Sequence, residues 1–451
     1  MDLALIVKQA EKFLQSFYSN LYDYHRANKN SLPLSQAFER ANIFTLETLA
    51  WLREELNANP EADHLRRLFR FIATGFIRYN LLPYDQELAQ HYDLLSWPNV
   101  WAQHDALSPG QPSPARPEAP LLAQLTAIYE QRWQKLNEQV ARLGFSSPVA
   151  FYAWASGIDL PALQQSARAI LEETKEAYFA ALAAIEPPLE DRWQLESYMR
   201  GENYDPCFPA AELVPAIEDT LYHLGLDITR QPNLMLEVSR ELPAGFALAF
   251  PVRVPEEIYV CISPKEGIDA FENSLGLGGM VMARLLRDPK QCWYQRRLSD
   301  PALDAAYAEV FTSLVTLSAW RGDMLGESAA CPQLQAFTQL RQLYRLRLAA
   351  ARVIFAISRS QGQNQGPAIF TQALGVNHDP SAQILDMGHM RVALDTFRGM
   401  RVGAQLAAQL VNTYGPAWYR HPACGQALRD LFHQGPSHLN ELTTCCNFAI
   451  S

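Results

Sequence analysis

The sequence lacks an excess of positive charge and any long apolar run. Its 451 residues include 38 Lys and Arg against 48 Asp and Glu, a formal net charge of -10. Nucleic-acid-binding surfaces need clustered basic residues, and a membrane-spanning helix needs about 20 apolar residues. Charged residues such as Lys8 and Glu11 interrupt the apolar stretch that a signal peptide would require. We therefore expect a soluble, cytoplasmic protein with neither a nucleic-acid nor a membrane partner.

The sequence also lacks paired cysteines and clustered histidines. Its seven cysteines are scattered without a Cys-x-x-Cys motif, which argues against a disulfide framework and a zinc knuckle. Adjacent Cys445 and Cys446 are interpreted as buried thiols at a helix end, with redox sensitivity as the alternative. None of the ten histidines form an i, i+4 pair, so we expect surface or capping roles for nearly all of them. A serine-nucleophile motif, a phosphate-binding glycine loop and a dinucleotide fingerprint are also missing.

Apolar residues recur with a helical period through most of the chain. Three long helices are predicted, over about residues 6–21, 65–76 and 160–182, the last with Asp159 as its N-cap. Five prolines between residues 108 and 120 predict a loop. We expect an N-terminal helical region over 1–190, with this loop inside it, and a second region over 191–451, the two forming one compact body.

Only the middle of the chain predicts strands. Apolar residues alternate with others over 234–238 and again over 258–262. The connection over 241–257 contains three prolines and is predicted to be irregular. A small antiparallel sheet is therefore expected just before a helix that begins near Ile268.

The helix after Ile268 carries three glycines within four positions, Gly276, Gly278 and Gly279. Each interior glycine costs about 1 kcal/mol relative to alanine. Close approach of another backbone or of a ligand would explain their presence.

The segment 248–280, LAFPVRVPEEIYVCISPKEGIDAFENSLGLGGM, resembles the active-site approach of oligoendopeptidase-F-like and thimet-oligopeptidase-like zinc peptidases. In that family a strand and a glycine turn lead into a helix bearing His-Glu-x-Gly-His. Aligning the family glycine with Gly276 puts the first histidine on Asn273, the glutamate on Ser274 and the second histidine on Leu277. Catalytic zinc needs three protein ligands, and serine cannot act as the general base at neutral pH.

The resemblance covers roughly residues 160–440 and includes two further segments with chemical roles. Matching Ala306-Tyr307-Ala308 to the family's second active-site helix puts the glutamate ligand on Ala305. Matching Ala404-Gln405-Leu406 puts the oxyanion-stabilising tyrosine on Thr396 and retains Arg398. Glu309, one turn beyond Ala305, would be the ligand only if the Tyr-Ala match were abandoned.

The resemblance implies a mainly α, helical oligopeptidase-like body with the small sheet beside a central channel. Because all five chemical positions are replaced, we expect a catalytically inactive homologue of these gluzincin peptidases, a pseudopeptidase without zinc that retains a cleft for a peptide or protein partner. Tyr307, Arg398 and Gly276 are the candidate binding residues. The alternatives are an active zinc peptidase with relocated ligands, such as Glu309, and a structural subunit of an assembly.

Two charged groups outside the motif allow two interpretations each. Glu266, Asp269 and Glu272 are predicted to be solvated acids at a helix N-terminus, with a cation site as the alternative. The stripe of Arg341, Arg345 and Arg352, with Arg347 beside it, is predicted to pair with acids elsewhere. Its alternative role is to bind an anionic partner.

Overall fold

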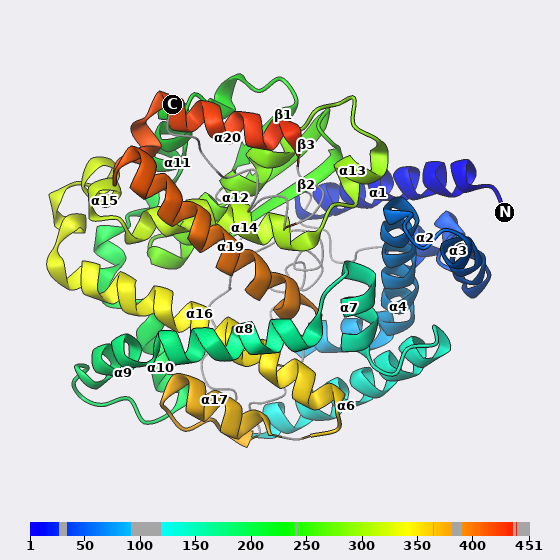
Figure 1. Ribbon diagram of the computed structural model, residues 1–451. Helices are drawn as coiled ribbons and strands as arrows, with labels where there is room; N and C mark the ends of the chain where they lie inside the picture. Colours follow the sequence, from blue (N-terminus) through cyan, green and yellow to red (C-terminus); the bar gives the residue numbers. More distant parts are fainter. Residues whose placement is uncertain are drawn as a thin grey trace.

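The computed structural model describes residues 1–26, 34–91, 119–239, 242, 244–363, 365–380, 386, 390–435 and 439. It is 75% helical with one small sheet, so the mainly α prediction is confirmed. Helices surround the sheet and extend away from it (Figure 1). No helix within the described ranges is long and apolar enough to cross a membrane. The helices are α1 (Leu3–Arg26), α2 (Leu34–Ala41), α3 (Leu46–Ala58), α4 (Asp63–His91), α6 (Ala119–Arg142), α7 (Pro148–Ser156), α8 (Leu160–Glu173), α9 (Lys175–Ala183), α10 (Arg192–Arg200), α11 (Leu213–His223), α12 (Ile268–Leu285), α13 (Trp293–Arg297), α14 (Pro301–Thr312), α15 (Ser318–Leu325), α16 (Pro332–Ser360), α17 (Gly366–Leu374), α19 (Met390–Tyr414) and α20 (Pro422–Gln434).

The sheet has three strands, β1 (Leu234–Val238), β2 (Ala247–Arg253) and β3 (Glu257–Ile262), in the order β1-β3-β2. β2 pairs antiparallel with β3, whereas β1 runs parallel to β3, so the antiparallel pairing expected for the strands over 234–238 and 258–262 was wrong and the sheet is mixed. The connection predicted to be irregular therefore contains β2. Its residues are buried on both faces up to Val252, so it shows no alternation in the sequence, and Pro251 lies at a register shift of this edge strand.

The predicted helices are present, with one interruption. Asp159 caps α8, where its carboxylate accepts a hydrogen bond from the amide of Ala162 at 3.1 Å. The helix predicted to run to residue 182 is two helices, because it breaks at Thr174, whose hydroxyl donates to the Ile170 carbonyl at 2.6 Å. The predicted proline-rich loop lies outside the described residues as far as 118, and α6 begins at Ala119. Cys445 and Cys446 also lie outside the described residues.

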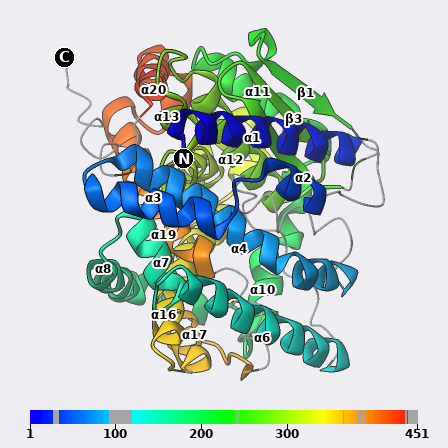
Figure 2. The ribbon, with the colours of Figure 1, turned by 90° about the vertical axis from the view of Figure 1, so that its right-hand side faces the viewer.

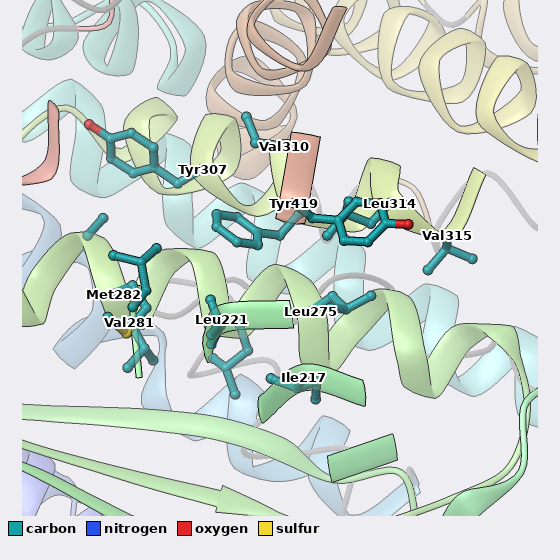
Figure 3. Close-up of a cluster of buried hydrophobic side chains, with 14 of the residues drawn as sticks. Ile217, Leu221, Leu275, Val281, Met282, Tyr307, Val310, Leu314, Val315 and Tyr419 are labelled. Carbon is teal, nitrogen blue, oxygen red and sulfur yellow. The ribbon is translucent and has the colours of Figure 1, made fainter. Parts of the chain in front are cut away.

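α14 packs between α12 and α19, and this triplet forms the centre of the C-terminal part (Figure 1). Apolar side chains fill the space around α12 and α14, among them Leu275 and Val310 (Figure 3). A Cβ atom on Gly279 would lie 2.7 Å from the Tyr307 carbonyl oxygen. The glycine is therefore needed for close approach of another backbone, one of the two explanations that the sequence left open.

α19 approaches α14 equally closely through two glycines one turn apart. A Cβ atom on Gly399 would lie 2.4 Å from the Ala302 carbonyl oxygen, and one on Gly403 would lie 2.5 Å from the Ala306 carbonyl oxygen. Ala305 faces this contact, at 2.3 Å from the Cβ that Gly399 lacks. Small residues on both helices thus bring the two backbones together.

The N-terminal helices join the sheet from the side of β2. α1 packs against β2 and lies across the sheet (Figure 2). The ring of Tyr22 in α1 lies 5.7 Å from the ring of Phe250 in β2. α1, α3, α4 and β2 share one apolar core, which brings the N-terminal helices beside α13 and α14.

Candidate ligand-binding site

Acidic residues of α12 and α14 meet arginines of α16 in a buried ion network. Arg341 donates from Nε and Nη2 to the two oxygens of Glu272, at 3.1 and 2.8 Å, and also contacts Asp269. Arg345 donates from Nη2 to Oε2 of Glu309 at 3.0 Å and lies 3.9 Å from Glu272. The carboxylates of Glu272 and Glu309 are almost fully buried, with 7% and 4% of their side chains exposed. Two arginines of α16 therefore hold three carboxylates of α12 and α14.

The two glutamates respond differently to this environment. Burial alone would raise the pKa of Glu272, but the guanidinium groups of Arg341 and Arg345 hold that pKa below its usual value. Burial raises the pKa of Glu309, and the single partner Arg345 opposes this only in part. Glu272 is therefore the more strongly held anion of the pair.

This network decides how the acidic residues at the start of α12 and the arginine stripe of α16 are interpreted. Asp269 and Glu272 pair with Arg341 and are not solvated acids, whereas Glu266 is exposed. The expectation of a solvated cluster was wrong for the first two, because α16 packs against the start of α12. Two further arginines of the stripe are also engaged: Arg347 donates to the carbonyls of Ala373 and Leu171 and to the Thr174 hydroxyl, and Arg352 lies 3.5 Å from Asp386.

The three replaced positions on α12 face the core. Asn273, Ser274 and Leu277 are all buried, and Leu277 belongs to the apolar cluster around α12 and α14. Gly276 is buried in the same helix. None of the four is among the described residues that line the cavity discussed below.

Of the remaining predicted site residues, two line a cavity and two are engaged elsewhere. Ala305 of α14 and Thr396 of α19 line one cavity together. Tyr307 points into the core instead, with its ring 5.1 Å from that of Phe432. Arg398 is held by Asp300, with Nη2 donating to Oδ2 at 2.6 Å and Nη1 to Oδ1 at 3.2 Å, and it also donates to Asp395.

The residues that the resemblance assigns to the metal ligands do not fit a zinc ion. An amide, an isobutyl group and a methyl group stand at Asn273, Leu277 and Ala305, whereas zinc needs three Cys, His or carboxylate ligands. Two buried carboxylates on these helices, Glu272 and Glu309, are already held by arginines. In the part of the chain that the structure describes, no three His, Cys, Asp or Glu residues group together as a metal would require.

Two buried histidines depart from the predicted surface roles. The ring of His25 lies 4.9 Å from Phe246 and 5.6 Å from Phe250, and burial lowers its pKa to about 4. His378 lies 3.2 Å from Asp386 through Nε2 and stacks on Phe370. The aromatic neighbours of His25 are distant along the chain, so no local pattern marks its burial.

A cavity of about 150 Å³ lies where the N-terminal helices meet α13, α14 and α19. This volume is the space open to the centre of a water-sized sphere, of which one water molecule needs about 10–15 Å³. The cavity would therefore hold on the order of ten waters or the end of a ligand. Aromatic residues from α1, α2 and α4 make up much of its wall. The aromatic lining residues are Phe13, Phe17, Tyr18, Phe38, Phe44, Phe71 and Tyr152.

Arginine dominates the charge of this cavity. Six arginines and two aspartates line it, a formal balance of +4 in a chain whose net charge is -10. No sequence pattern marks this group: four of the arginines lie within residues 284–297, but the other two come from α4. The charged lining residues are Arg70, Arg78, Arg284, Arg287, Arg296, Arg297, Asp304 and Asp395.

Comparison with solved structures defines the class of fold. The chain is similar to an M32 carboxypeptidase from Deinococcus radiodurans R1, at 14% identity, with 98% of this chain and 94% of that one covered and a TM-score of 0.53. A carboxypeptidase from Pyrococcus furiosus gives 10% identity, coverage of 99% and 96%, and a TM-score of 0.56. Metallocarboxypeptidase 1 of Trypanosoma cruzi gives 13% identity, coverage of 98% and 95%, and a TM-score of 0.53.

These likenesses establish a metallopeptidase-like, mainly α fold. No protein-family profile matches the chain, and no curated protein matches it in sequence. The three neighbours reported above are carboxypeptidases, one of them named as M32, and they do not specifically support the oligoendopeptidase-F or thimet families that the sequence suggested. The sequence resemblance therefore indicated a metallopeptidase-like fold, but the reported neighbours do not support the family that it named.

Proposed function

We propose that this protein is a catalytically inactive metallopeptidase homologue that binds the carboxyl-terminal end of a peptide in its arginine-lined cavity. The observation that carries the proposal is the ion network: Arg341 and Arg345 neutralise the carboxylates of Glu272 and Glu309 on the two helices where the resemblance expects metal ligands. A buried carboxylate that already accepts hydrogen bonds from a guanidinium would have to lose that partner before it could bind a metal, at a large energetic cost.

The cavity supports the binding half of the proposal. It contains Ala305 and Thr396, two of the positions at which the resemblance expects chemistry. Both positions carry small side chains, which leave space next to the aromatic wall. Concave sites with an apolar wall and a few polar groups are typical of ligand-binding pockets. The similar solved structures are those of carboxypeptidases, enzymes that act at peptide carboxyl ends, and arginine forks suit a carboxylate.

An active peptidase with relocated ligands is the second candidate. It would use Glu309, but the salt bridge to Arg345 at 3.0 Å opposes this role. A role as a structural subunit would need neither an accessible cavity nor a peptide ligand. The oligoendopeptidase-like and gluzincin assignments and the cytoplasmic location are proposals that rest on the sequence.

The test combines a binding and a cleavage measurement on the full chain. Fluorescent peptides with free carboxyl ends are titrated and followed by anisotropy, and the same peptides are incubated with added zinc and analysed by mass spectrometry. We expect saturable binding and intact peptides. Thr396→Trp should block the cavity and abolish binding, whereas Thr396→Ser should preserve it, provided that both variants retain the circular dichroism of the parent.

Two results would contradict the proposal. Chelator-sensitive loss of carboxyl-terminal residues would identify an active enzyme. An absence of binding across peptides of varied sequence, by a folded protein, would remove the binding role.

A further inference from the structure

We infer that the cavity selects acidic peptide ends, those that carry a side-chain carboxylate next to the terminal carboxylate. This inference rests on the proposed function and adds the ligand's charge to it. A terminal carboxylate alone brings one negative charge, whereas the described lining residues carry a formal excess of four positive charges. The walls therefore have cationic groups for more than one carboxylate.

At least two of the six arginines already have acidic partners. Arg284 pairs with Asp304, which also lines the cavity, and Arg296 lies 3.0 Å from Glu256. The second lining aspartate, Asp395, accepts a hydrogen bond from Arg398 at 3.1 Å. The acids near the cavity are thus largely committed to arginines that they already contact.

Arg70 and Arg287 have a different environment, because they donate hydrogen bonds only to neutral oxygens. Arg70 donates to the carbonyls of Leu298 and Ser299, at 3.1 and 2.8 Å. Arg287 donates from Nη1 to the carbonyl of Gln295 at 3.0 Å and makes longer bonds to the Arg296 carbonyl and the Ser299 hydroxyl. Carbonyl oxygens fix these guanidinium groups in place but do not neutralise their charge.

Burial makes this remaining charge costly. It lowers the pKa of Arg70, which the more distant Asp300 and Asp395 oppose, and it lowers the pKa of Arg287. A carboxylate that enters the cavity would replace the water lost by these groups, and guanidinium–carboxylate bonds are stronger than neutral ones. The positions of Arg70 and Arg287 are set before a ligand arrives, which reduces the ordering cost of binding.

The kind of cation and the apolar wall favour a carboxylate-bearing peptide over a nucleic acid. No lysine is present among the described lining residues, and arginine's planar fork matches a carboxylate. The ring of Tyr18 lies 5.4 Å from the guanidinium carbon of Arg297, so an aromatic surface adjoins a cation. The net charge of -10 would repel a long polyanion, while a cavity of about 150 Å³ admits only a chain end.

The test compares three peptides that share one sequence and differ only at the end: Phe-Asp with a free carboxylate, Phe-Asn with a free carboxylate, and Phe-Asp amide. Binding to the full chain is measured by isothermal titration calorimetry at two salt concentrations. We expect the Phe-Asp acid to bind about tenfold or more tightly than the Phe-Asn acid, since hydrogen bonds to a charged group are the stronger kind. This preference should decrease as salt concentration rises.

Matched variants locate the effect. Thr74 lines the cavity from α4, so Thr74→Glu should reduce the preference for aspartate by adding a competing carboxylate, while Thr74→Gln should retain it. Arg297→Gln should also reduce the preference, whereas Arg230→Gln makes the same charge change at a side chain that is 81% exposed and should have no effect.

The outcomes separate the two proposals. Equal affinity for the Phe-Asp and Phe-Asn acids would overturn the acidic preference and leave peptide binding standing. Failure of all peptides to bind would overturn both. An aspartate preference that Thr74→Glu leaves unchanged in a folded protein would overturn the assignment to this cavity.

Discussion

Replacing Arg341 by methionine probes the buried ion network with little change in side-chain length. The substitution removes both hydrogen bonds to Glu272 and the contacts with Asp269 and the Met199 carbonyl. Glu272 would then face Arg345 alone, at 3.9 Å. Removing one partner of a buried ion pair costs about 3–5 kcal/mol, and we expect a decrease of this size in the free energy of unfolding at pH 7.

Urea unfolding followed by circular dichroism measures this loss. Arg230→Met is the matched control: its side chain is 81% exposed and pairs with Asp227, so its loss should be about 0–1 kcal/mol. Adding Glu272→Leu to Arg341→Met should recover part of the stability, because the buried Glu272 carboxylate is then gone and only the partly exposed Asp269 loses its partner.

The pH dependence provides a further check. The pKa of Glu272 is lowered in the folded protein, so its stabilising contribution is present above its unfolded pKa and is lost as the pH falls through the folded value. The difference between wild type and Arg341→Met should therefore shrink in acid. A loss below about 1 kcal/mol at pH 7, or a double variant as unstable as the sum of its two single variants, would refute the buried network.

Two further predictions concern packing and acid stability. Gly403→Ala should lower the free energy of unfolding by about 1–3 kcal/mol through overpacking, since its Cβ would lie 2.5 Å from the Ala306 carbonyl oxygen. Gly322→Ala is the control, because the nearest neighbour of its Cβ would lie at 3.6 Å, and it should be neutral or stabilising. Equal effects of the two variants in urea unfolding would contradict the close contact of α14 and α19. The pKa of His25 falls from 6.5 to about 4 on folding, so the unfolded chain takes up a proton first and stability should decrease by about 3 kcal/mol as the pH falls through that range. His25→Phe should remove this part of the acid sensitivity, and an unchanged pH profile in thermal unfolding would contradict the assignment.

The sequence predicts the helices well and the sheet only in part. Local signals such as the apolar period and the Asp159 cap are sufficient for α8, because they depend on neighbouring residues. The pattern did not predict β2 because α1 and α12 pack against it and both of its faces are buried, which removes the alternation that marks a strand. The parallel pairing of β1 with β3 depends on the route of the connection, which no residue pattern specifies.

The site was predictable to a similar degree. The three glycines of α12 indicated close approach of another backbone or a ligand, and Gly279 lies against the backbone of α14 at Tyr307. The pairing of Arg341 with Glu272 spans 69 residues, so the acids were interpreted as solvated when only their position at a helix start was visible. The cavity combines α1, α4 and α13, segments with no sequence signal in common. Its charge therefore emerges only from the tertiary structure.

Zinc stoichiometry tests the central claim most directly. The purified full chain is saturated with zinc, dialysed and analysed by inductively coupled plasma mass spectrometry. The network of Glu272, Glu309 and their arginines predicts far less than one zinc per chain, with no change in thermal stability on adding zinc or chelator. One tightly held zinc per chain, with stability lost on chelation, would contradict it.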